Sequence, residues 1–271
     1  MIKRACITGA SGFIGKHLIS YLDKRKYEVY SLDHALLLDP PQLKYYLQTT
    51  KPEYIFHLAA YGNLNIHAKE EQKIFDANLT GLFNLLQASK DIPYEGFVNV
   101  SSSSVLLSYQ TMYAATKAGG EHLCHAFRSL YNKPIVTLRP FSLYGENDHK
   151  SHLIPLLFNS CLKGHEMRIA YDPVHDYVYV GDFVERMAYY AAHAREKDIV
   201  HVGTGDTISN YWLCKEIEQI TGKEAHITGT NEPRPYDNDE WAMRPHMGNC
   251  DYVKTTLTEG LQKVFKSYKL Q

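Results

Sequence analysis

The chain has 271 residues, of which 44% are hydrophobic, and its formal net charge is −1 at pH 7. This length and composition allow one large hydrophobic core, or one core with a smaller appended lobe. A net charge near zero gives no general attraction for nucleic acids or anionic lipids, so any bound polyanion must be small and held locally. Five scattered cysteines without a Cys-x-x-Cys pair indicate a reduced, cytoplasmic protein. No apolar run approaches the roughly 18 residues of a membrane span.

The N-terminal segment predicts a strand, a tight turn and a helix. Residues 5–7 form a short apolar run typical of a buried strand, and apolar residues recur at helical spacing over residues 13–22. Gly9, Gly12 and Gly15 stand in the turn and the first helical turn. Glycines at such a turn let the backbone approach a diphosphate, which the N–H groups and the positive end of the helix attract. We therefore expect a dinucleotide here, although a glycine triplet is also compatible with a plain strand-to-helix connection.

A second apolar run, residues 27–32, ends in Asp33. A carboxylate at the tip of the second strand accepts hydrogen bonds from an adenosine ribose, and no arginine follows closely to bind a 2′-phosphate. The sequence therefore favours NAD over NADP. The route from Asp33 to the next strand, residues 54–60, is unusually short and contains one helix around residues 43–47.

The first half of the chain continues to alternate between strand and helix patterns. A helix is predicted over residues 76–90, a strand over 97–100, a helix from Tyr113 onward and a strand over 134–140. About six alternations favour an α/β fold, a doubly wound parallel sheet of the Rossmann type. Four serines, residues 101–104, follow strand 97–100, at the edge where open α/β sheets bind ligands.

Beyond about residue 145 the pattern changes. We predict helices near residues 153–162, from Asp182 onward, between Ser209 and Gly222 and over about 256–267, with short strands near 167–171, 177–180 and 199–203. Residues 1–145 are thus expected to form a dinucleotide-binding domain, with returns to the sheet near 177–210. Residues 146–271 are expected to form mainly a smaller, interleaved substrate-binding lobe, and the irregular acidic segment 231–240 is a place where substrate could lie.

Tyr113 and Lys117 are four residues apart on a predicted helix, so their side chains share one face. A free phenol has a pKa of about 10, and an adjacent ammonium favours the phenolate and lowers this pKa. The pair could then act as a general acid and base at neutral pH. A tyrosine and a lysine at this spacing are often a surface coincidence, but here they follow a serine cluster in a chain that begins with the glycine turn.

The glycine spacing of residues 9–15, read together with Tyr113 and Lys117, resembles the extended short-chain dehydrogenase/reductase family of nucleotide-sugar epimerases and dehydratases. The resemblance implies that a serine or threonine polarises the substrate oxygen, that the tyrosine moves its proton and that the lysine also binds the nicotinamide ribose. The register of the family places the hydroxyl at Ser102, with Ser103 as the alternative. The implied catalytic residues are therefore Ser102, Tyr113 and Lys117.

The same resemblance implies a cofactor site. Residues 57–60 would close a strand beside NAD, and Asn78 would lie on a cofactor-side helix, although an amide in such a helix is as often a satisfied core group. Pro140 and Phe141 would lie near the nicotinamide. The expected cofactor-binding residues are Gly9, Gly12, Phe13, Ile14, Gly15, Asp33, Leu58, Ala59, Ala60, Asn78, Tyr113, Lys117, Pro140 and Phe141.

The expected substrate-binding residues lie mainly in the C-terminal half. Ser142 stands where the family commonly has asparagine, and His175 stands where arginine is usual. Arg234 would bind a nucleotide diphosphate, although a surface salt bridge is an equally good interpretation from sequence alone. Ser103 completes this set.

Two departures from the family pattern bear on the reaction. The loop between Ser102 and Tyr113 is shorter than in sugar-modifying members, which leaves the identity of the sugar open. Ser103 and Ser104 stand where sugar dehydratases carry an Asp-Glu pair, so dehydration is disfavoured. The first hypothesis is NAD-dependent 4-epimerisation of a nucleotide-activated sugar through a transient 4-keto intermediate. A reductase of a 4-keto-6-deoxy nucleotide sugar and a non-catalytic dinucleotide sensor are the alternatives.

The chain contains 14 histidines, and His122 and His125 lie three apart on the predicted Tyr113 helix. No third ligand accompanies them, so we expect ordinary helix residues and no metal. The resemblance further implies that helices 76–90 and 113–131 pair with those of a second subunit in a homodimer. The expected partner is a small nucleotide-sugar substrate, with no nucleic acid and no membrane.

Overall fold

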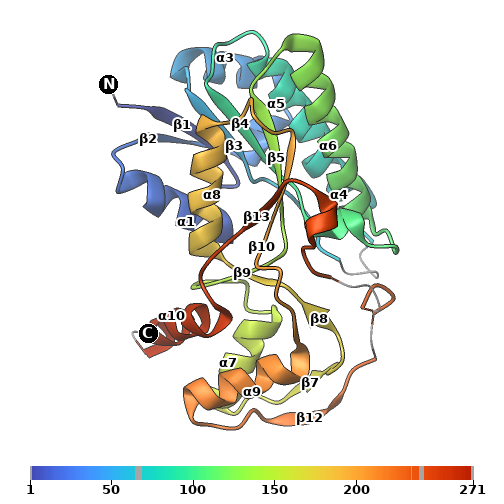
Figure 1. Ribbon diagram of the computed structural model, residues 1–271. Helices are drawn as coiled ribbons and strands as arrows, with labels where there is room; N and C mark the ends of the chain where they lie inside the picture. Colours follow the sequence, from blue (N-terminus) through green and yellow to red (C-terminus); the bar gives the residue numbers. More distant parts are fainter. Residues whose placement is uncertain (1, 65–68, 233, 238–240, 270–271) are drawn as a thin grey trace. The chain divides into compact units, whose positions relative to one another are not determined.

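The computed structural model describes residues 2–64, 69–232, 234–237 and 241–269. The chain divides into two compact units, whose elements are labelled in Figure 1. Unit 1 comprises Met1–Leu106, Gln110–Pro140 and Val184–His201, and unit 2 comprises Leu107–Tyr109, Phe141–Phe183 and Val202–Gln271. Each unit is therefore built from segments that are distant in the sequence.

A seven-stranded sheet has the order β13-β10-β5-β4-β3-β1-β2. Its strands are β1 (Arg4–Thr8), β2 (Glu28–Leu32), β3 (Tyr54–His57), β4 (Gly96–Val100), β5 (Ile135–Pro140), β10 (Ile199–Gly203) and β13 (Cys250–Tyr252). The pairings β1 with β2, β1 with β3, β3 with β4 and β4 with β5 are all parallel. From β1 the chain first moves to β2 on one side and then to β3 on the other, which confirms the predicted doubly wound sheet.

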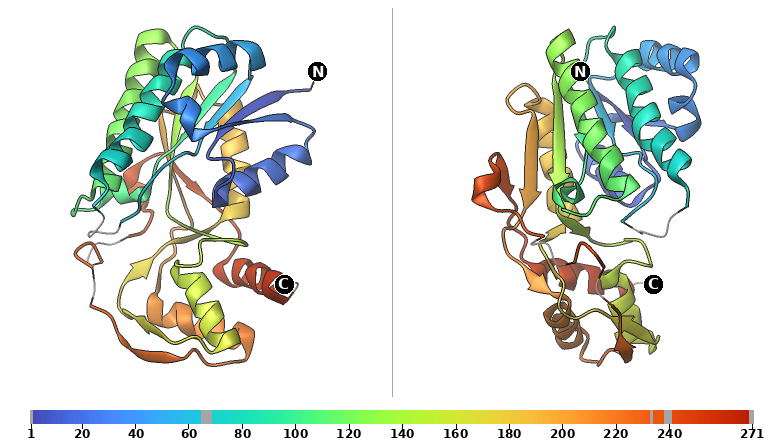
Figure 2. Two further views of the ribbon diagram at one scale, coloured as in Figure 1. Left: turned by 180° about the vertical axis from the view of Figure 1, so that it is seen from behind. Right: turned by 90° about the vertical axis from the view of Figure 1, so that its right-hand side faces the viewer.

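The strands β3 and β4 are buried along their whole length, as expected for parallel strands that are covered on both faces. One face of the sheet carries α1 (Phe13–Asp23) and α8 (Val180–Ala192), and the other carries α3 (Pro40–Thr50), α5 (Gly81–Ser89) and α6 (Met112–Tyr131) (Figures 1 and 2). Right-handed crossover connections account for this placement of α1, α3, α5 and α6. The connection from β1 to β2 runs toward one edge of the sheet and the later connections run toward the other edge, so α1 lies on the opposite face from the other three helices. The apolar core of unit 1 lies between the sheet and α3, α5 and α6.

Two helical segments differ from the sequence prediction. A short helix, α2 (His34–Leu37), directly follows β2, and it precedes α3. The predicted helix over 76–90 begins earlier, because α4 (Glu71–Phe75) and a π-helical segment, η1 (Asp76–Thr80), run without interruption into α5. Such π segments occur frequently at functional sites. The serine cluster continues into a 3₁₀ turn, η2 (Ser103–Leu106).

Unit 2 has its own apolar core, formed by residues of α7, α9 and α10 around the buried side chain of Tyr144. Its elements are β6 (Ser142–Tyr144), α7 (Leu153–Lys163), β7 (Met167–Ile169), β8 (Val174–His175), β9 (Tyr177–Tyr179), β11 (Ile208–Ser209), α9 (Asn210–Thr221), β12 (Ile227–Thr230), η3 (Pro245–Met247) and α10 (Leu257–Lys269). Six of the strands form three two-stranded pairs: β6 with β9, β8 with β11 and β7 with β12.

The predicted limits of α9 are confirmed. The Ser209 side chain accepts a hydrogen bond from the backbone N–H of Trp212, and Gly222 ends the helix in the left-handed conformation. Among the described residues, none of the helices combines the length and apolar character that a membrane crossing requires.

Candidate active site

The glycine turn follows β1 at the carboxyl edge of the sheet. Gly9 has a φ of +68°, and a Cβ atom on it would lie 2.8 Å from the backbone nitrogen of Ala59. A Cβ atom on Gly15 would lie 2.4 Å from the carbonyl oxygen of Gly9. Gly12 is the N-cap of α1 and offers no side chain to the first helical N–H groups. The turn is therefore a bare backbone cradle at a helix start, which fits a dinucleotide diphosphate.

Thr8, which the sequence analysis did not identify, joins this turn to the end of β3. Its hydroxyl oxygen accepts hydrogen bonds from the backbone N–H groups of Leu58 (3.1 Å) and Ala59 (3.0 Å). It also lies 3.0 Å from Nδ1 of the buried His57, whose pKa is lowered to about 3 by burial and by the charge of Lys117. His57 is therefore neutral near pH 7. The segment expected beside NAD is thus held next to the glycine turn, and Ala60 follows it as an exposed residue.

The remaining predicted cofactor residues of the first two strands lie at the same edge. Phe13 and Ile14 open α1 and are half-buried, and the ring of Phe13 meets that of His17 edge to face at 5.4 Å. Asp33 is exposed immediately after β2, and its carboxylate accepts a hydrogen bond of 3.3 Å from the N–H of Ala35. Asp33 is therefore the N-cap of α2 in this structure, and its second carboxylate oxygen can accept from another donor.

Asn78 lies in the π-helical segment η1 and is 4% exposed. Its amide accepts a hydrogen bond from the N–H of Tyr61 (2.8 Å) and donates to the Tyr61 carbonyl (3.1 Å). The same amide nitrogen lies 2.9 Å from the hydroxyl oxygen of Thr116 on α6. Asn78 thus links η1 to the chain after β3 and to α6, where its partner Thr116 directly precedes Lys117. This is the satisfied core arrangement that the sequence left open.

Ser102, Tyr113 and Lys117 lie together where β4 ends and α6 begins. A hydrogen bond links Ser102 to Tyr113, and the Lys117 ammonium lies 5.9 Å from the centre of the Tyr113 ring. The ammonium donates to the carbonyl oxygen of Val100 at 2.8 Å. The hydroxyl of Ser102 also accepts from the N–H of Ser104 at 3.1 Å, which holds it at the start of the 3₁₀ turn. The alternative residue, Ser103, is buried next to it.

The pKa values of this group differ from the sequence expectation. Burial raises the pKa of Tyr113, and the hydrogen bond from Ser102 is what lowers it, so Lys117 is not the main influence that we predicted. The reason is that the ammonium is directed to Val100. Burial lowers the pKa of Lys117 to about 8, against the opposing effects of Cys124 and Glu121. Lys117 can therefore lose its proton within the range of mildly alkaline pH.

Pro140 ends β5 and is buried, and Phe141, the first residue of the following segment of unit 2, is 4% exposed. Within unit 2, Ser142 and His175 lie together, with the Ser142 hydroxyl 3.4 Å from the His175 Nδ1. The ring centre of His175 also lies 5.7 Å from that of Tyr177 and 5.0 Å from that of Trp241. Burial, and secondly the charge of Arg234, lower the pKa of His175 to about 4, so this ring is neutral near pH 7.

Arg234 forms a bidentate pair with Asp237, at 2.8 to 3.1 Å. Its guanidinium also lies 4.7 Å from the centre of the Tyr236 ring. The salt bridge that the sequence left open is therefore present, and an incoming anion would share or displace Asp237. Pro233 and residues 238–240 of the predicted irregular segment lie outside the described residues.

Asp176 is a buried carboxylate that the sequence analysis did not single out. It is 0% exposed and accepts four hydrogen bonds, two from Thr204, one from Gly205 and one from Met243. Its backbone carbonyl accepts from the N–H of Ser142 at 2.9 Å. Asp176 therefore organises the surroundings of Ser142 and His175. Sequence spacing cannot reveal such a role, because the donors come from three separate segments.

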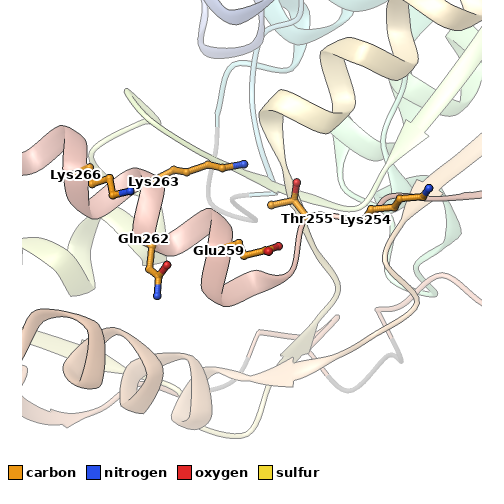
Figure 3. A pocket seen from close by; sticks show the side chains of 6 residues that line it. All are labelled: Lys254, Thr255, Glu259, Gln262, Lys263 and Lys266. Carbon is orange, nitrogen blue, oxygen red and sulfur yellow. The ribbon is translucent and has the colours of Figure 1, made fainter.

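A surface pocket of unit 2 lies at the start of α10. Figure 3 shows the side chains that line it: Lys254, Thr255, Glu259, Gln262, Lys263 and Lys266. None of the predicted site residues lines this pocket.

His122 and His125 lie on α6, and both are at least partly accessible; His125 pairs with Asp198. Across the described part of the chain, no group of three or more His, Cys, Asp or Glu side chains is arranged to hold a metal ion.

Comparison with known proteins shows the family to which the chain belongs. Residues 5–203 match the NAD dependent epimerase/dehydratase family. An uncharacterized UDP-glucose epimerase of Bacillus subtilis is 27% identical over 277 residues, which cover 87% of this chain and 88% of that protein. A dTDP-D-glucose 4,6-dehydratase of Dictyostelium discoideum is 24% identical over 81% of this chain, and the match spans 62% of the length of that protein.

The fold is also that of a solved enzyme. The crystal structure of UDP-glucose 4-epimerase from Thermus thermophilus, in complex with NAD, superimposes with a TM-score of 0.86 at 24% identity. The match covers 98% of this chain and 99% of that one. At this level of identity the similarity establishes the fold alone.

Proposed function

Since the chain belongs to the NAD dependent epimerase/dehydratase family, we propose that it is an enzyme that inverts C4 of a nucleotide-activated sugar through a transient 4-keto intermediate. The observation that carries the proposal is the hydrogen-bonded pair of Ser102 and Tyr113, with the buried Lys117 on the same helical face. This arrangement provides a hydroxyl donor, a proton acceptor and a cation at the carboxyl edge of the sheet. These are the groups that oxidation and reduction of an alcohol require.

Each residue has a defined task in this proposal. Tyr113 removes the proton of the C4 hydroxyl and later returns it, while Ser102 donates a hydrogen bond to the same sugar oxygen. The resting phenol of Tyr113 is neutral, so proton removal requires its phenolate. The Lys117 charge, 5.9 Å from the centre of the ring, would favour that form when substrate and cofactor are bound. NAD, when bound, accepts and returns the hydride. Inversion requires the keto sugar to turn before it is reduced on its opposite face, and the overall reaction is redox-neutral.

The cofactor-binding residues are proposed on the geometry of the glycine turn. A Cβ atom on Gly9 or Gly15 would collide with the neighbouring backbone, so the bare cradle at the start of α1 depends on both glycines. Asp33 is exposed at the end of β2, and we assign it to the adenosine ribose. These residues fit NAD, and Leu58, Ala59 and Ala60 would lie along the same edge.

We assign the nucleotide diphosphate of the substrate to the cluster of Ser142, His175 and Arg234. Arg234 is the cation of this cluster, while the neutral ring of His175 offers a hydrogen bond. A dehydratase is disfavoured because Ser103 and Ser104, which follow Ser102, are 2% and 0% exposed hydroxyl residues that cannot replace a pair of carboxyl groups.

The test is a cofactor and substrate assay. The purified protein is denatured to identify any released dinucleotide, and UDP-, GDP-, CDP- and dTDP-sugars are then supplied with product analysis. Retained NAD and an isomeric sugar, without net change in NADH absorbance, is the expected result. Net consumption of NADH with a keto sugar would establish a reductase instead, and failure with every sugar would contradict the proposal.

We further propose a homodimer formed through α5 and α6. Phe83, Leu130 and Tyr131 are 40%, 75% and 43% exposed, and Phe127 links the rings of Phe83 and Tyr131. Together they form an apolar strip on two adjacent helices. Sedimentation as a monomer at micromolar concentration would contradict the dimer.

We also propose a cytoplasmic location. All five cysteines are free thiols, which is the usage typical of a reducing compartment.

A further inference from the structure

Three residues of α6 present the same face toward the end of β4. Tyr113, Lys117 and Glu121 are spaced four residues apart, so they lie one above the other along the helix. Tyr113 and Lys117 belong to the proposed catalytic group. Glu121 does not, although it is only 5% exposed.

Three consecutive residues at the end of β4 contact these three side chains. Ser102 forms a hydrogen bond with Tyr113, and the carbonyl oxygen of Val100 accepts from the Lys117 ammonium at 2.8 Å. The intervening residue, Ser101, donates its hydroxyl to a carboxylate oxygen of Glu121 at 2.5 Å. The strand end is therefore attached to three successive turns of α6, and the hydrogen bond from Ser101 to Glu121 is buried.

Glu121 is itself held from β5. The Arg139 guanidinium donates to one carboxylate oxygen at 2.7 Å through Nε and forms a second bond with the other oxygen. A planar, bidentate pair of this kind restricts both the position and the orientation of the carboxylate. The Glu121 carboxylate is therefore a junction between β4, β5 and α6.

The charge of Glu121 also acts on Lys117. Burial removes water from the ammonium and lowers its pKa, and Cys124, followed by Glu121, both on the same helix, oppose this effect. From β3 the buried His57 faces Lys117 as a neutral ring, and the Tyr113 phenol is neutral as well because burial raises its pKa. Glu121 is accordingly the carboxylate among the groups that act on Lys117.

We propose that Glu121 is a positioning residue for the proposed catalytic group: through Ser101 it keeps the end of β4 in register with α6, and it places a negative charge one helical turn from the Lys117 ammonium. Arg139 orients Glu121 for both tasks. The inference rests on the proposed function only in naming Tyr113 and Lys117 as catalytic. An ion pair that merely attached α6 to β5 would contribute to stability without affecting the titration of Lys117.

The decisive variant is Glu121→Gln, which removes the charge and keeps nearly the same shape. Lysine side chains labelled with ¹³C at Cε are titrated by NMR, with Lys117→Arg to assign the Lys117 signal. We expect the Lys117 midpoint to fall, because an opposing negative charge has been lost. An unchanged midpoint in a folded Glu121→Gln protein would overturn the charge role.

Glu53→Gln is the matched control. Glu53 also forms a bidentate pair with an arginine, Arg4, at 3.2 and 3.3 Å, but it lies at the amino end of the sheet. This variant should lower the melting temperature and leave the Lys117 midpoint unchanged. If it shifts that midpoint as much as Glu121→Gln does, the effect is not specific and the inference fails.

Ser101→Ala separates position from charge. It removes the hydroxyl that attaches β4 to Glu121 and leaves the pair with Arg139 in place. We expect kcat to fall about tenfold with little change in KM and with the Lys117 midpoint retained, whereas a parental kcat would overturn the positioning role.

Should Glu121→Gln not fold, Glu121→Asp retains the charge and must retain the midpoint; a large fall there would contradict the inference. If the parent protein turns over no nucleotide sugar, the proposed function fails while the Lys117 titration still decides the charge role.

Discussion

Replacement of Asp176 by asparagine should destabilise unit 2. Each oxygen of the buried carboxylate accepts two hydrogen bonds, one oxygen from the N–H and hydroxyl of Thr204 and the other from the N–H groups of Gly205 and Met243. An asparagine amide has one oxygen and one NH₂ group. Its favoured orientation keeps the oxygen on the N–H groups of Gly205 and Met243 and turns the NH₂ group to Thr204, whose hydroxyl can rotate and accept while its backbone N–H loses its acceptor. A buried donor without an acceptor costs about 1–3 kcal/mol.

Hydrogen exchange and urea unfolding measure this loss. The amide proton of Thr204 should exchange at least about fivefold faster in Asp176→Asn, which corresponds to about 1 kcal/mol. The free energy of unfolding from urea titration should fall by a similar amount. Asp206→Asn is the control, because Asp206 is exposed in the same loop and its replacement should change stability by less than about 0.5 kcal/mol.

The variant also tests the assignment of the substrate cluster. The Asp176 carbonyl accepts from the N–H of Ser142, and His175 precedes it in the chain, so loss of its side-chain bonds should raise KM more than it lowers kcat. A parental exchange rate at Thr204, together with parental stability, would refute the view that the carboxylate organises this part of unit 2.

Three further predictions concern the proposed catalytic unit. Gly15→Ala should weaken NAD binding at least about tenfold in calorimetry, because its Cβ would lie 2.4 Å from the Gly9 carbonyl oxygen; Gly229→Ala, with 3.4 Å to its nearest neighbour, should not. Tyr113→Phe should reduce kcat by about 10²–10⁴-fold and leave NAD binding largely intact, and an undiminished rate would exclude Tyr113 as the proton carrier. Turnover should decrease above about pH 8, where Lys117, whose pKa is lowered to about 8, loses its proton; a rate that is constant up to about pH 10 would contradict this role.

The features that the sequence predicts correctly are those encoded locally. The apolar run before Gly9, the three glycines and the helical spacing after them predict a strand, a turn and a helix, and all three are present. The limits of α9 follow similarly from Ser209 and Gly222, since capping depends on side chains within one turn of the helix end. The parallel, doubly wound sheet follows from the alternation of elements and the handedness of their connections.

Some features of the site were within reach of the sequence but were not recognised. Glu121 lies four residues after Lys117, and the same helical spacing that singled out Tyr113 and Lys117 also places Glu121 on their face. The pKa of Tyr113 was expected to respond mainly to Lys117. Burial and Ser102 dominate instead, because spacing along a helix does not reveal where an ammonium points.

The sequence by itself determined the order of the elements, the glycine cradle and the placement of Tyr113 and Lys117 on one face of a helix, because each depends on residues within a few positions of one another. Only the tertiary structure decided which partners complete the site. The Thr8 hydroxyl accepts from Leu58, the Glu121 carboxylate accepts from Arg139, and the Asp176 carboxylate accepts from Gly205. In each pair the two residues are separated by many positions in the chain. Such contacts depend on which strands become neighbours in the sheet and how loops pack, and these long-range arrangements leave no periodic pattern in the chain.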